Sequence, residues 1–241
     1  MTSIPSFSAY AIPDIPLIQE GDNVLKMTLD KISQANFDLQ NGDVLVVSSK
    51  IISKAQGQRI RLDSVIPSEE ALSLAEETAK DPRIVELILK ESLSVSRKRK
   101  GVLVTQHRLG FVSANSGIDQ SNVKDGEESA LLLPIDPDKT AQEFRTAIME
   151  QLGVDVGIVI SDTHGRPFRI GNVGVAIGVA GAPAVKDLRG RKDLYGRELE
   201  SSLEAYADLV ASAAHLLCGE ADEGYPVILM RGVDISPPYG I

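Results

Sequence analysis

The sequence of 241 residues contains a single cysteine, Cys218, and no tryptophan. One thiol excludes an intramolecular disulfide and is typical of the reducing cytoplasm. No apolar run approaches the ~18 residues that a membrane-spanning helix needs. Residues 1–10 also lack the basic and apolar regions of a signal peptide. We therefore expect a cytoplasmic protein with no membrane partner.

Aromatic side chains are also scarce, at 4% of the residues, so the core must consist mainly of Val, Ile, Leu and Ala. The composition is otherwise ordinary, with 43% hydrophobic and 24% charged residues, which is typical of a folded globular protein. The length allows one large domain or two small ones and is ample for a buried core.

Positive charge is in deficit, with 25 Lys and Arg against 34 Asp and Glu and a formal net charge of −9. An acidic surface repels nucleic-acid backbones, so we expect no nucleic-acid partner. The basic run at residues 97–100 is the one contrary feature. We interpret it as structural, because it lies where a helix is expected to end and cations stabilise helix C-termini.

The apolar pattern mixes helices and strands without regular alternation, which predicts an α+β fold with mixed β-sheets. A boundary between two parts of the chain is expected near residues 80–100. Helices are expected over residues 23–35, 68–80, from 82 onward, 139–152 and 201–217. Strands are expected over residues 44–47, 101–105, 109–113, 131–134, 154–160, 173–180 and 226–231.

Two segments place an aspartate among small polar residues just beyond an apolar strand, at Asp119 and Asp162. Mg²⁺ and Mn²⁺ prefer oxygen ligands and often bind one or two carboxylates together with phosphate oxygens. The hydroxyl or carbonyl of Thr163 could serve a second ion. Arg166 and Arg169 follow closely and could pair with a phosphate or carboxylate. The alternative is that each aspartate only forms a turn.

Lysines follow the strand expected at residues 44–47, at Lys50 and Lys54. A lysine there could reach a phosphate, or it could simply be solvated at a strand end. The sequence has no P-loop motif, so any nucleotide must be held in another way. The charged segment at residues 187–198 could likewise be a solvated loop or an anion-binding one.

A cluster of three carboxylates, Glu220, Asp222 and Glu223, follows the expected helix at 201–217. Because like charges repel, either a cation or solvent must accommodate them. None of the three histidines has a partner at metal-ligand spacing, so zinc is not expected. We interpret His215 as structural and His164 as a support for Asp162, and we do not expect Cys218 to be a nucleophile.

Seven segments resemble the coenzyme F420:L-glutamate ligase family when taken together and in order. The resemblance covers nearly the whole chain and implies that family's fold, which is two-lobed α+β in an intertwined homodimer. It also implies the stand-alone form, without a C-terminal nitroreductase-like domain. The segments are residues 15–18, 47–57, 113–119, 132–136, 161–171, 187–191 and 222–227.

The resemblance implies a reaction that joins L-glutamate to the phospholactyl carboxylate of coenzyme F420-0. GTP is spent through an acyl-phosphate intermediate, giving GDP and phosphate, and further γ-linked glutamates can follow. Such chemistry depends on positioning and charge neutralisation rather than on a protein nucleophile. Two divalent ions, Mg²⁺ or Mn²⁺, are implied, with K⁺ as a further candidate.

The resemblance also assigns residues. The first metal is expected on Asp119 and Asp162, and the second on Thr163 and Glu220. Asp119 and Asp162 are thus expected to be catalytic, and we add Arg166 and Arg169 from their position. The nucleotide site is expected to comprise Ile15, Pro16, Leu17, Ile18, Ser49, Lys50, Lys54, Asn122, Cys218, Gly219, Glu220, Ala221, Asp222, Glu223, Gly224 and Tyr225.

Two positions depart from the family's pattern, because Ser113 stands where Cys is usual and Glu220 where Gln is frequent. Glu220 adds a negative charge beside the second metal and could change the preferred ion. Three alternatives stay open from the sequence: a ligase of this fold for another carboxylate, a metal-dependent GTP phosphohydrolase, and a non-catalytic binding module.

Overall fold

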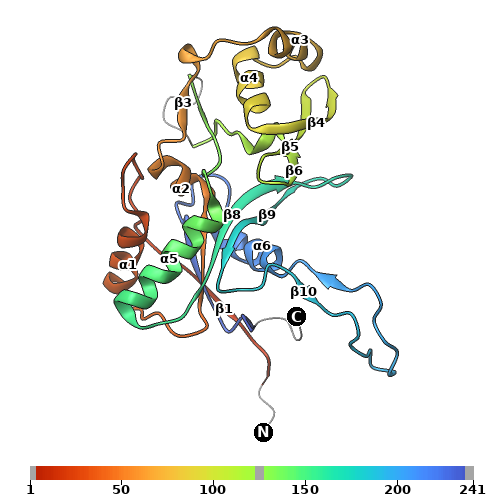
Figure 1. Cartoon of the computed structure of the whole chain (residues 1–241). Coiled ribbons are helices and arrows are strands. Elements are labelled where there is room, and N and C mark those ends of the chain that lie inside the picture. Colours follow the sequence, from red (N-terminus) through yellow and green to blue (C-terminus); the bar gives the residue numbers. More distant parts are fainter. Residues whose placement is uncertain (1–3, 123–127, 237–241) are drawn as a thin grey trace.

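The computed structural model describes residues 4–122 and 128–236. Within these ranges it contains six α-helices and several β-sheets, and the fold is mixed α+β as the sequence predicts (Figure 1). None of the described helices is both long enough and apolar enough to cross a bilayer.

The elements follow in chain order, with two short 3-10 helices between them. The helices are α1 (Val24–Gln34), α2 (Ser49–Ala55), η1 (Leu62–Ser64), α3 (Glu69–Thr78), α4 (Pro82–Lys90), η2 (Asn115–Gly117), α5 (Pro137–Leu152) and α6 (Tyr206–Cys218). The strands are β1 (Ser8–Ala11), β2 (Val44–Ser48), β3 (Arg59–Arg61), β4 (Ser92–Arg99), β5 (Val102–His107), β6 (Val112–Ala114), β7 (Ser129–Leu131), β8 (Gly157–Gly165), β9 (Asn172–Ala180), β10 (Lys186–Asp187), β11 (Leu203–Glu204) and β12 (Val227–Arg231).

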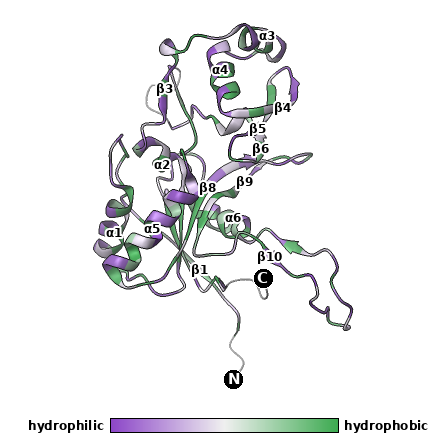
Figure 2. Cartoon of the chain, viewed as in Figure 1, coloured by the Kyte–Doolittle hydropathy of each residue, from purple (hydrophilic) through white to green (hydrophobic). Residues whose placement is uncertain are grey.

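The main sheet has the strand order β1-β12-β2-β8-β9 and is buried on both faces. In β2, Leu45 and Val47 face the core formed with α1, α2 and α5, whereas Val44 and Val46 face α6. Figure 2 shows hydrophobic residues gathered along these inner strands. Continuous apolar strands are expected when both faces of a sheet are covered. Burial of each such Val, Leu or Ile contributes about 1.5–3 kcal/mol.

A second hydrophobic cluster lies apart from the main sheet, at the end of the molecule where Figure 1 shows α3, α4 and β4. Ala71 and Leu74 of α3 and Val85 and Ile88 of α4 pack there with Leu103 of β5. The strands β4, β5 and β6 form a three-stranded antiparallel sheet beside these helices. This part of the chain begins near residue 60 and ends near residue 132.

Helix ends follow the predicted signals. Ser68 accepts a hydrogen bond from the backbone N–H of Ala71 at the start of α3, and Asp81 accepts one from Arg83 at the start of α4. Pro82 occupies the first turn of α4, where its missing N–H costs nothing. Gly153 ends α5 in the left-handed conformation, at φ +69°.

Several sequence predictions differ from the structure. The strand expected at 109–113 is Val112–Ala114, and the one expected at 131–134 is Ser129–Leu131. The basic run at residues 97–100 is not a helix end, because α4 stops at Lys90 and β4 carries the run along a sheet edge. Charged residues on an edge strand discourage pairing with other chains. The helix expected from residue 201 begins at Tyr206, since residues 203–204 pair with β10. The strand expected at 154–160 begins at Gly157 and continues to Gly165.

Two glycines of β9 allow helices to approach opposite faces of the sheet. A Cβ at Gly174 would lie 2.6 Å from the carbonyl oxygen of Ala211 in α6, and one at Gly178 would lie 2.4 Å from the carbonyl carbon of Pro137 in α5. Ile177 is an extra residue in the register with β8. This bulge changes the face of the sheet on which the following residues lie. Gly174 therefore lies against α6 and Gly178 against α5.

We expect Gly178→Ala to lower the free energy of unfolding by about 2 kcal/mol, because the added methyl forces α5 away from the sheet. Gly165→Ala is the matched control, since its Cβ would meet nothing closer than 3.7 Å. It should change stability by less than about 0.5 kcal/mol. Urea denaturation measures both, and equal losses would contradict the close-approach argument.

Candidate active site

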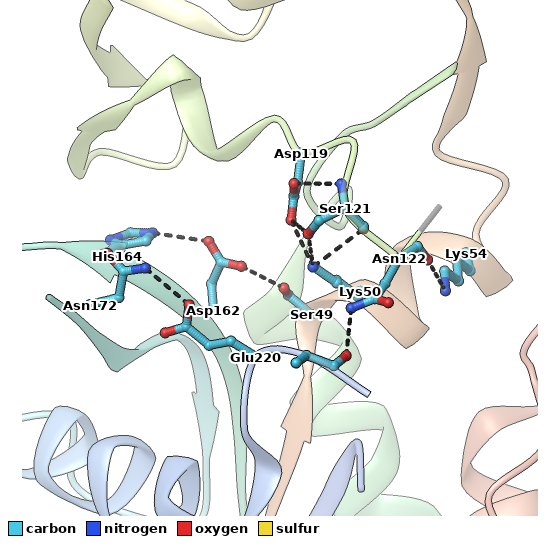
Figure 3. Close-up of polar contacts among 11 residues, drawn as sticks. Ser49, Lys50, Lys54, Asp119, Ser121, Asn122, Asp162, His164, Asn172 and Glu220 are labelled. Atoms are coloured by element: carbon cyan, nitrogen blue, oxygen red, sulfur yellow. Dashed lines mark hydrogen bonds and ion pairs between the residues drawn. The ribbon is translucent and has the colours of Figure 1, made fainter. Parts of the chain in front are cut away.

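A cavity of about 570 Å³ lies where the main sheet meets the segment that follows η2. The wall of the cavity includes the carboxyl end of β2 and the middle of β8, which pair in parallel with Ser48 opposite Ser161. The residues that follow β2 therefore lie beside the part of β8 that continues past this pairing to Gly165. Figure 3 shows the polar side chains that meet there.

Most of the predicted site residues line this cavity, although they come from five distant segments of the chain. The exceptions are Ser49, which lies buried beneath it, and the two arginines, Arg166 and Arg169. The predicted residues in its wall are Ile15, Pro16, Leu17, Ile18, Lys50, Lys54, Asp119, Asn122, Asp162, Thr163, Cys218, Gly219, Glu220, Ala221, Asp222, Glu223, Gly224 and Tyr225.

Asp162 is fixed by one donor on each carboxylate oxygen. The hydroxyl of Ser49 donates to Oδ1 at 2.9 Å, and Nε2 of His164 donates to Oδ2 at 3.1 Å. Only 13% of the Asp162 side chain is exposed. The sequence predicted that Asp162 lies just beyond a strand, but the residue lies within β8. Strand pairing with Val175 therefore fixes its backbone as well.

Asp119 follows η2 and is bridged to β7 through backbone hydrogen bonds with Leu131. Its carboxylate accepts hydrogen bonds from the Ser121 backbone N–H at 2.8 Å and the Ser121 hydroxyl at 2.7 Å. Lys50 Nζ lies 2.7 Å from Oδ2. Burial by itself would raise the pKa of Asp119, but Lys50 and Ser121 together outweigh it and hold the pKa below its ordinary value.

The two predicted lysines share one face of α2, because they are spaced by one helical turn. Lys50 Nζ donates to the Ser121 hydroxyl at 2.8 Å, and Lys54 Nζ donates to the Asn122 carbonyl at 2.9 Å. Burial, and then repulsion from Lys50, lowers the pKa of Lys54. Both ammonium groups therefore hold the 119–122 segment against α2 and leave positive charge at the cavity wall.

The carboxylates after α6 are held apart by separate partners. Glu220 accepts hydrogen bonds from Asn172 Nδ2 at 3.0 Å and His215 Nε2 at 3.1 Å, and these, the Asn172 bond first, lower its pKa. Glu223 accepts from the Ala221 backbone N–H at 2.8 Å. Burial, together with the nearby charge of Glu223, raises the pKa of Cys218.

Sequence reasoning missed three residues of this arrangement. His215 was interpreted as structural, yet it lines the cavity and donates to Glu220. Its place in the last turn of α6 was the available signal, since residues there face the segment that follows the helix. Asn172 and Ser121 carried no signal in the sequence, because their partners lie on other strands and loops.

Arg166 and Arg169 remain in the hairpin between β8 and β9, outside the cavity wall. Arg166 donates to the carbonyl oxygen of Ile170 at 2.7 Å and to that of Gly171 at 3.4 Å. The Arg166 guanidinium therefore bonds to the backbone of its own hairpin in this structure.

The donor chemistry of the cavity fits a hard divalent cation. Its carboxylates and hydroxyls supply the oxygen ligands that Mg²⁺ and Mn²⁺ prefer. Within residues 4–122 and 128–236, no three His, Cys, Asp or Glu side chains stand close enough together to hold an ion without other ligands. Phosphate oxygens or water would therefore have to complete any coordination shell.

An α+β protein with carboxylates and lysines around one open cavity has the features of an enzyme that handles phosphorylated small molecules. The model of the family described as F420-0:Gamma-glutamyl ligase matches residues 13–232. The chain belongs to this family and is therefore an enzyme of the ligase class.

Curated relatives carry the same family name. The coenzyme F420:L-glutamate ligase of Methanopyrus kandleri is 44% identical over 97% of this chain and 90% of its own length. The corresponding ligase of Methanothermobacter thermautotrophicus is 45% identical over 93% of this chain and 88% of its own length. That of Archaeoglobus fulgidus is 43% identical over 94% and 88%, respectively.

We expect Gly219→Ala to open the wall of the cavity after α6. Gly219 has φ +66°, and a Cβ there would lie 2.1 Å from the carboxyl carbon of Glu223. The Glu223 carboxylate must move away and give up its bond to the Ala221 backbone N–H, which loosens the segment. Cys218 should then react with an alkylating reagent about tenfold faster, equivalent to about 1.4 kcal/mol of easier opening.

Gly42→Ala is the control, because its φ of +87° is also positive and its Cβ would meet nothing within 4 Å. The control should leave the alkylation rate unchanged. An unchanged rate in Gly219→Ala as well would show that Glu223 does not keep this wall closed.

Proposed function

We propose that the chain catalyses the GTP-dependent ligation of L-glutamate to the phospholactyl carboxylate of coenzyme F420-0. The observation that carries the proposal is the convergence of Asp119, Asp162 and Glu220 with Lys50 and Lys54 on one cavity, in a member of this ligase family. A substrate with a triphosphate needs both kinds of charge, because lysines bind phosphate oxygens and carboxylates hold the accompanying cations.

The proposed reaction has two steps. An oxygen of the F420-0 carboxylate attacks the γ-phosphorus of GTP, the bond to the GDP oxygen breaks, and an acyl phosphate forms. The α-amine of glutamate then attacks the acyl carbon, phosphate leaves, and the amine loses a proton to give the amide. Repetition at the glutamyl carboxylate would add further γ-linked residues.

Within this proposal, Asp119 and Asp162 hold the first divalent ion and Thr163 and Glu220 the second. When bound, such ions neutralise phosphate charge and favour departure of GDP. The chain's own residues supply the rest. Ser49 and His164 fix the carboxylate of Asp162, and Asn172 and His215 fix that of Glu220. Preorganised groups of this kind need not reorganise during the reaction.

The nucleotide is proposed to lie along α2 and the segment from Cys218 to Tyr225. Lys50, Lys54, Asn122 and residues 15–18 and 219–225 all line the cavity, and Asn122 Nδ2 donates to the Ala221 carbonyl oxygen at 3.0 Å. Backbone groups can hold a base and ribose in this way without a P-loop. Arg166 and Arg169 are retained as partners for a substrate carboxylate, which requires that their hairpin rearranges when the substrate binds.

The larger architecture is also part of the proposal. The separate hydrophobic clusters support two lobes, with the second lobe spanning roughly residues 60–132. We further propose that the chain forms a homodimer and acts in the cytoplasm, the latter supported by the single thiol. Sedimentation equilibrium tests the dimer directly.

The reaction is tested by incubating the protein with GTP, Mn²⁺ and L-glutamate, with and without F420-0. We expect phosphate release that requires both acceptor and glutamate, together with a mass gain of one glutamyl unit. Release that is indifferent to F420-0 would instead favour a phosphohydrolase or another acceptor. A folded chain that binds GTP without turnover would be a binding module.

Asp162→Ala should lower turnover by at least ~100-fold, because it removes a carboxylate at the centre of the charge-neutralising site. Asp30→Ala is the matched control, since Asp30 lies on α1 in an exposed ion pair with Lys26. Turnover measured as glutamylated product distinguishes the two variants. Comparable activity in both would remove Asp162 from the proposed site.

Lys54→Met should raise the KM for GTP about tenfold while changing kcat less than about twofold, because a phosphate contact of this kind contributes similarly to ground state and transition state. Lys26→Met provides the control, since its ammonium group is largely exposed and pairs only with Asp30 among the described residues. An unchanged KM in Lys54→Met would place the triphosphate elsewhere.

A further inference from the structure

Three aromatic rings form a ladder between the β5–β6 hairpin and β8. The imidazole of His107 stacks on the ring of Phe111, with centroids 5.0 Å apart and planes 3° apart. The same Phe111 ring contacts the imidazole of His164, with centroids 5.1 Å apart and planes tilted by 50°. Such ring contacts stabilise the structure beyond simple burial.

The base of the ladder is held rigidly. The His107 side chain is fully buried, and its Nδ1 accepts a hydrogen bond from the Leu109 backbone N–H at 3.0 Å. The proton of the ring therefore lies on Nε2, which is 3.4 Å from Glu91 Oε2 but forms no hydrogen bond among the described residues, so burial and the Leu109 bond hold the ring. Arg108 Nε in turn donates to Glu91 at 2.9 Å. Phe111 thus rests on a ring that cannot easily turn.

The upper end of the ladder is the ring that touches Asp162. His164 lies where β8 enters a hairpin whose tip is open to solvent, with Phe168 99% and Ile170 98% exposed. A histidine ring has a broad two-fold torsional preference, so the backbone alone does not decide which nitrogen faces the carboxylate. The described ring packed against the His164 imidazole is that of Phe111.

We propose that Phe111 is a positioning residue for Asp162 and acts through the imidazole of His164. The inference rests on the proposed function, in which the Asp162 carboxylate holds a cation. Ser49 restrains one oxygen of that carboxylate and His164 the other. Loss of the His164 bond leaves the carboxylate free to rotate about the remaining one, so its donor oxygens no longer point in one direction.

The ladder also connects two segments of the site through a side-chain contact. Phe111 precedes β6 and η2, and these lead directly to Asp119. A contact from Phe111 to β8 therefore ties the segment that carries Asp119 to the strand that carries Asp162. Displacement by about 1 Å is enough to lower rates by up to 100-fold when two reacting groups must be held together.

The test is Phe111→Leu, which keeps an apolar side chain but removes the ring. We expect kcat for glutamylated product to fall roughly tenfold while the KM for GTP changes less than about twofold. Phe111→Tyr keeps the ring and should restore most of the rate. The matched control is Phe37→Leu, because Phe37 makes a ring contact of the same tilt, 50° at 4.7 Å, with Tyr10 on β1, the edge strand of the main sheet that lies away from β8.

A second measurement needs no turnover. The chain has three histidines, so imidazole N–H signals can be followed individually by NMR. In Phe111→Leu the Nε2 proton of His164 should exchange with solvent faster, whereas in Phe37→Leu it should not. Wild-type kcat together with unchanged exchange in Phe111→Leu would overturn the proposal.

Failure of the proposed function and failure of the positioning proposal can be told apart. If the wild-type chain makes no amide bond, the proposed function fails, yet the exchange measurement still supports or overturns the positioning of His164. If Phe111→Leu does not fold, His164→Gln and His164→Leu replace it. Glutamine retains an N–H donor near Asp162, so His164→Gln should keep more activity than His164→Leu, and equal activities would overturn the role of the imidazole bond.

Discussion

The site depends on the parallel pairing of β2 with β8 at the centre of the main sheet. This pairing places Ser48 opposite Ser161, so the next residue of each segment, Ser49 and Asp162, also lie side by side, and their side chains form a hydrogen bond. Burial on both faces favours one register, because a slip by one residue would exchange the side chains packed against α6 with those packed against α1, α2 and α5. The core therefore positions the side chains of the site as well as stabilising the fold. The two lysines of α2 are positioned by the same strand, because α2 follows β2 directly.

Much of the main sheet could be predicted because its signals are local. The apolar runs of β2, β9 and β12 and the caps of α3, α4 and α5 all depend on neighbouring residues in the sequence. The β4 strand could not be predicted in this way. Its residues are almost all exposed, so no burial pattern marks them, and pairing with β5 across a turn at Gly101 makes them a strand.

The residues of the site likewise differ in whether local sequence signals could predict them. Residue types and order were sufficient to nominate Asp119, Asp162 and Lys50, and these do meet at one cavity. Their partners were not predictable, because Asn172 and His215 reach Glu220 from a strand and a helix that the sequence does not relate. Non-local hydrogen bonds leave no periodic pattern, which is why sequence reasoning nominated the carboxylates and lysines and missed the hydrogen-bond donors that orient the carboxylates.

The three carboxylates share a pattern that accounts for how an acidic cavity remains folded. Each accepts a hydrogen bond from a hydroxyl or amide group and a second one from a nitrogen of another side chain: Ser49 with His164, Asn172 with His215, and Ser121 with Lys50. A hydroxyl or amide donor fixes direction at little electrostatic cost, whereas the ammonium group of Lys50 also offsets the negative charge of Asp119. In the proposed reaction, an arriving cation would meet carboxylates that already point in fixed directions. Lys50 would give up its contact with Asp119, and a triphosphate would offer its ammonium group a new one.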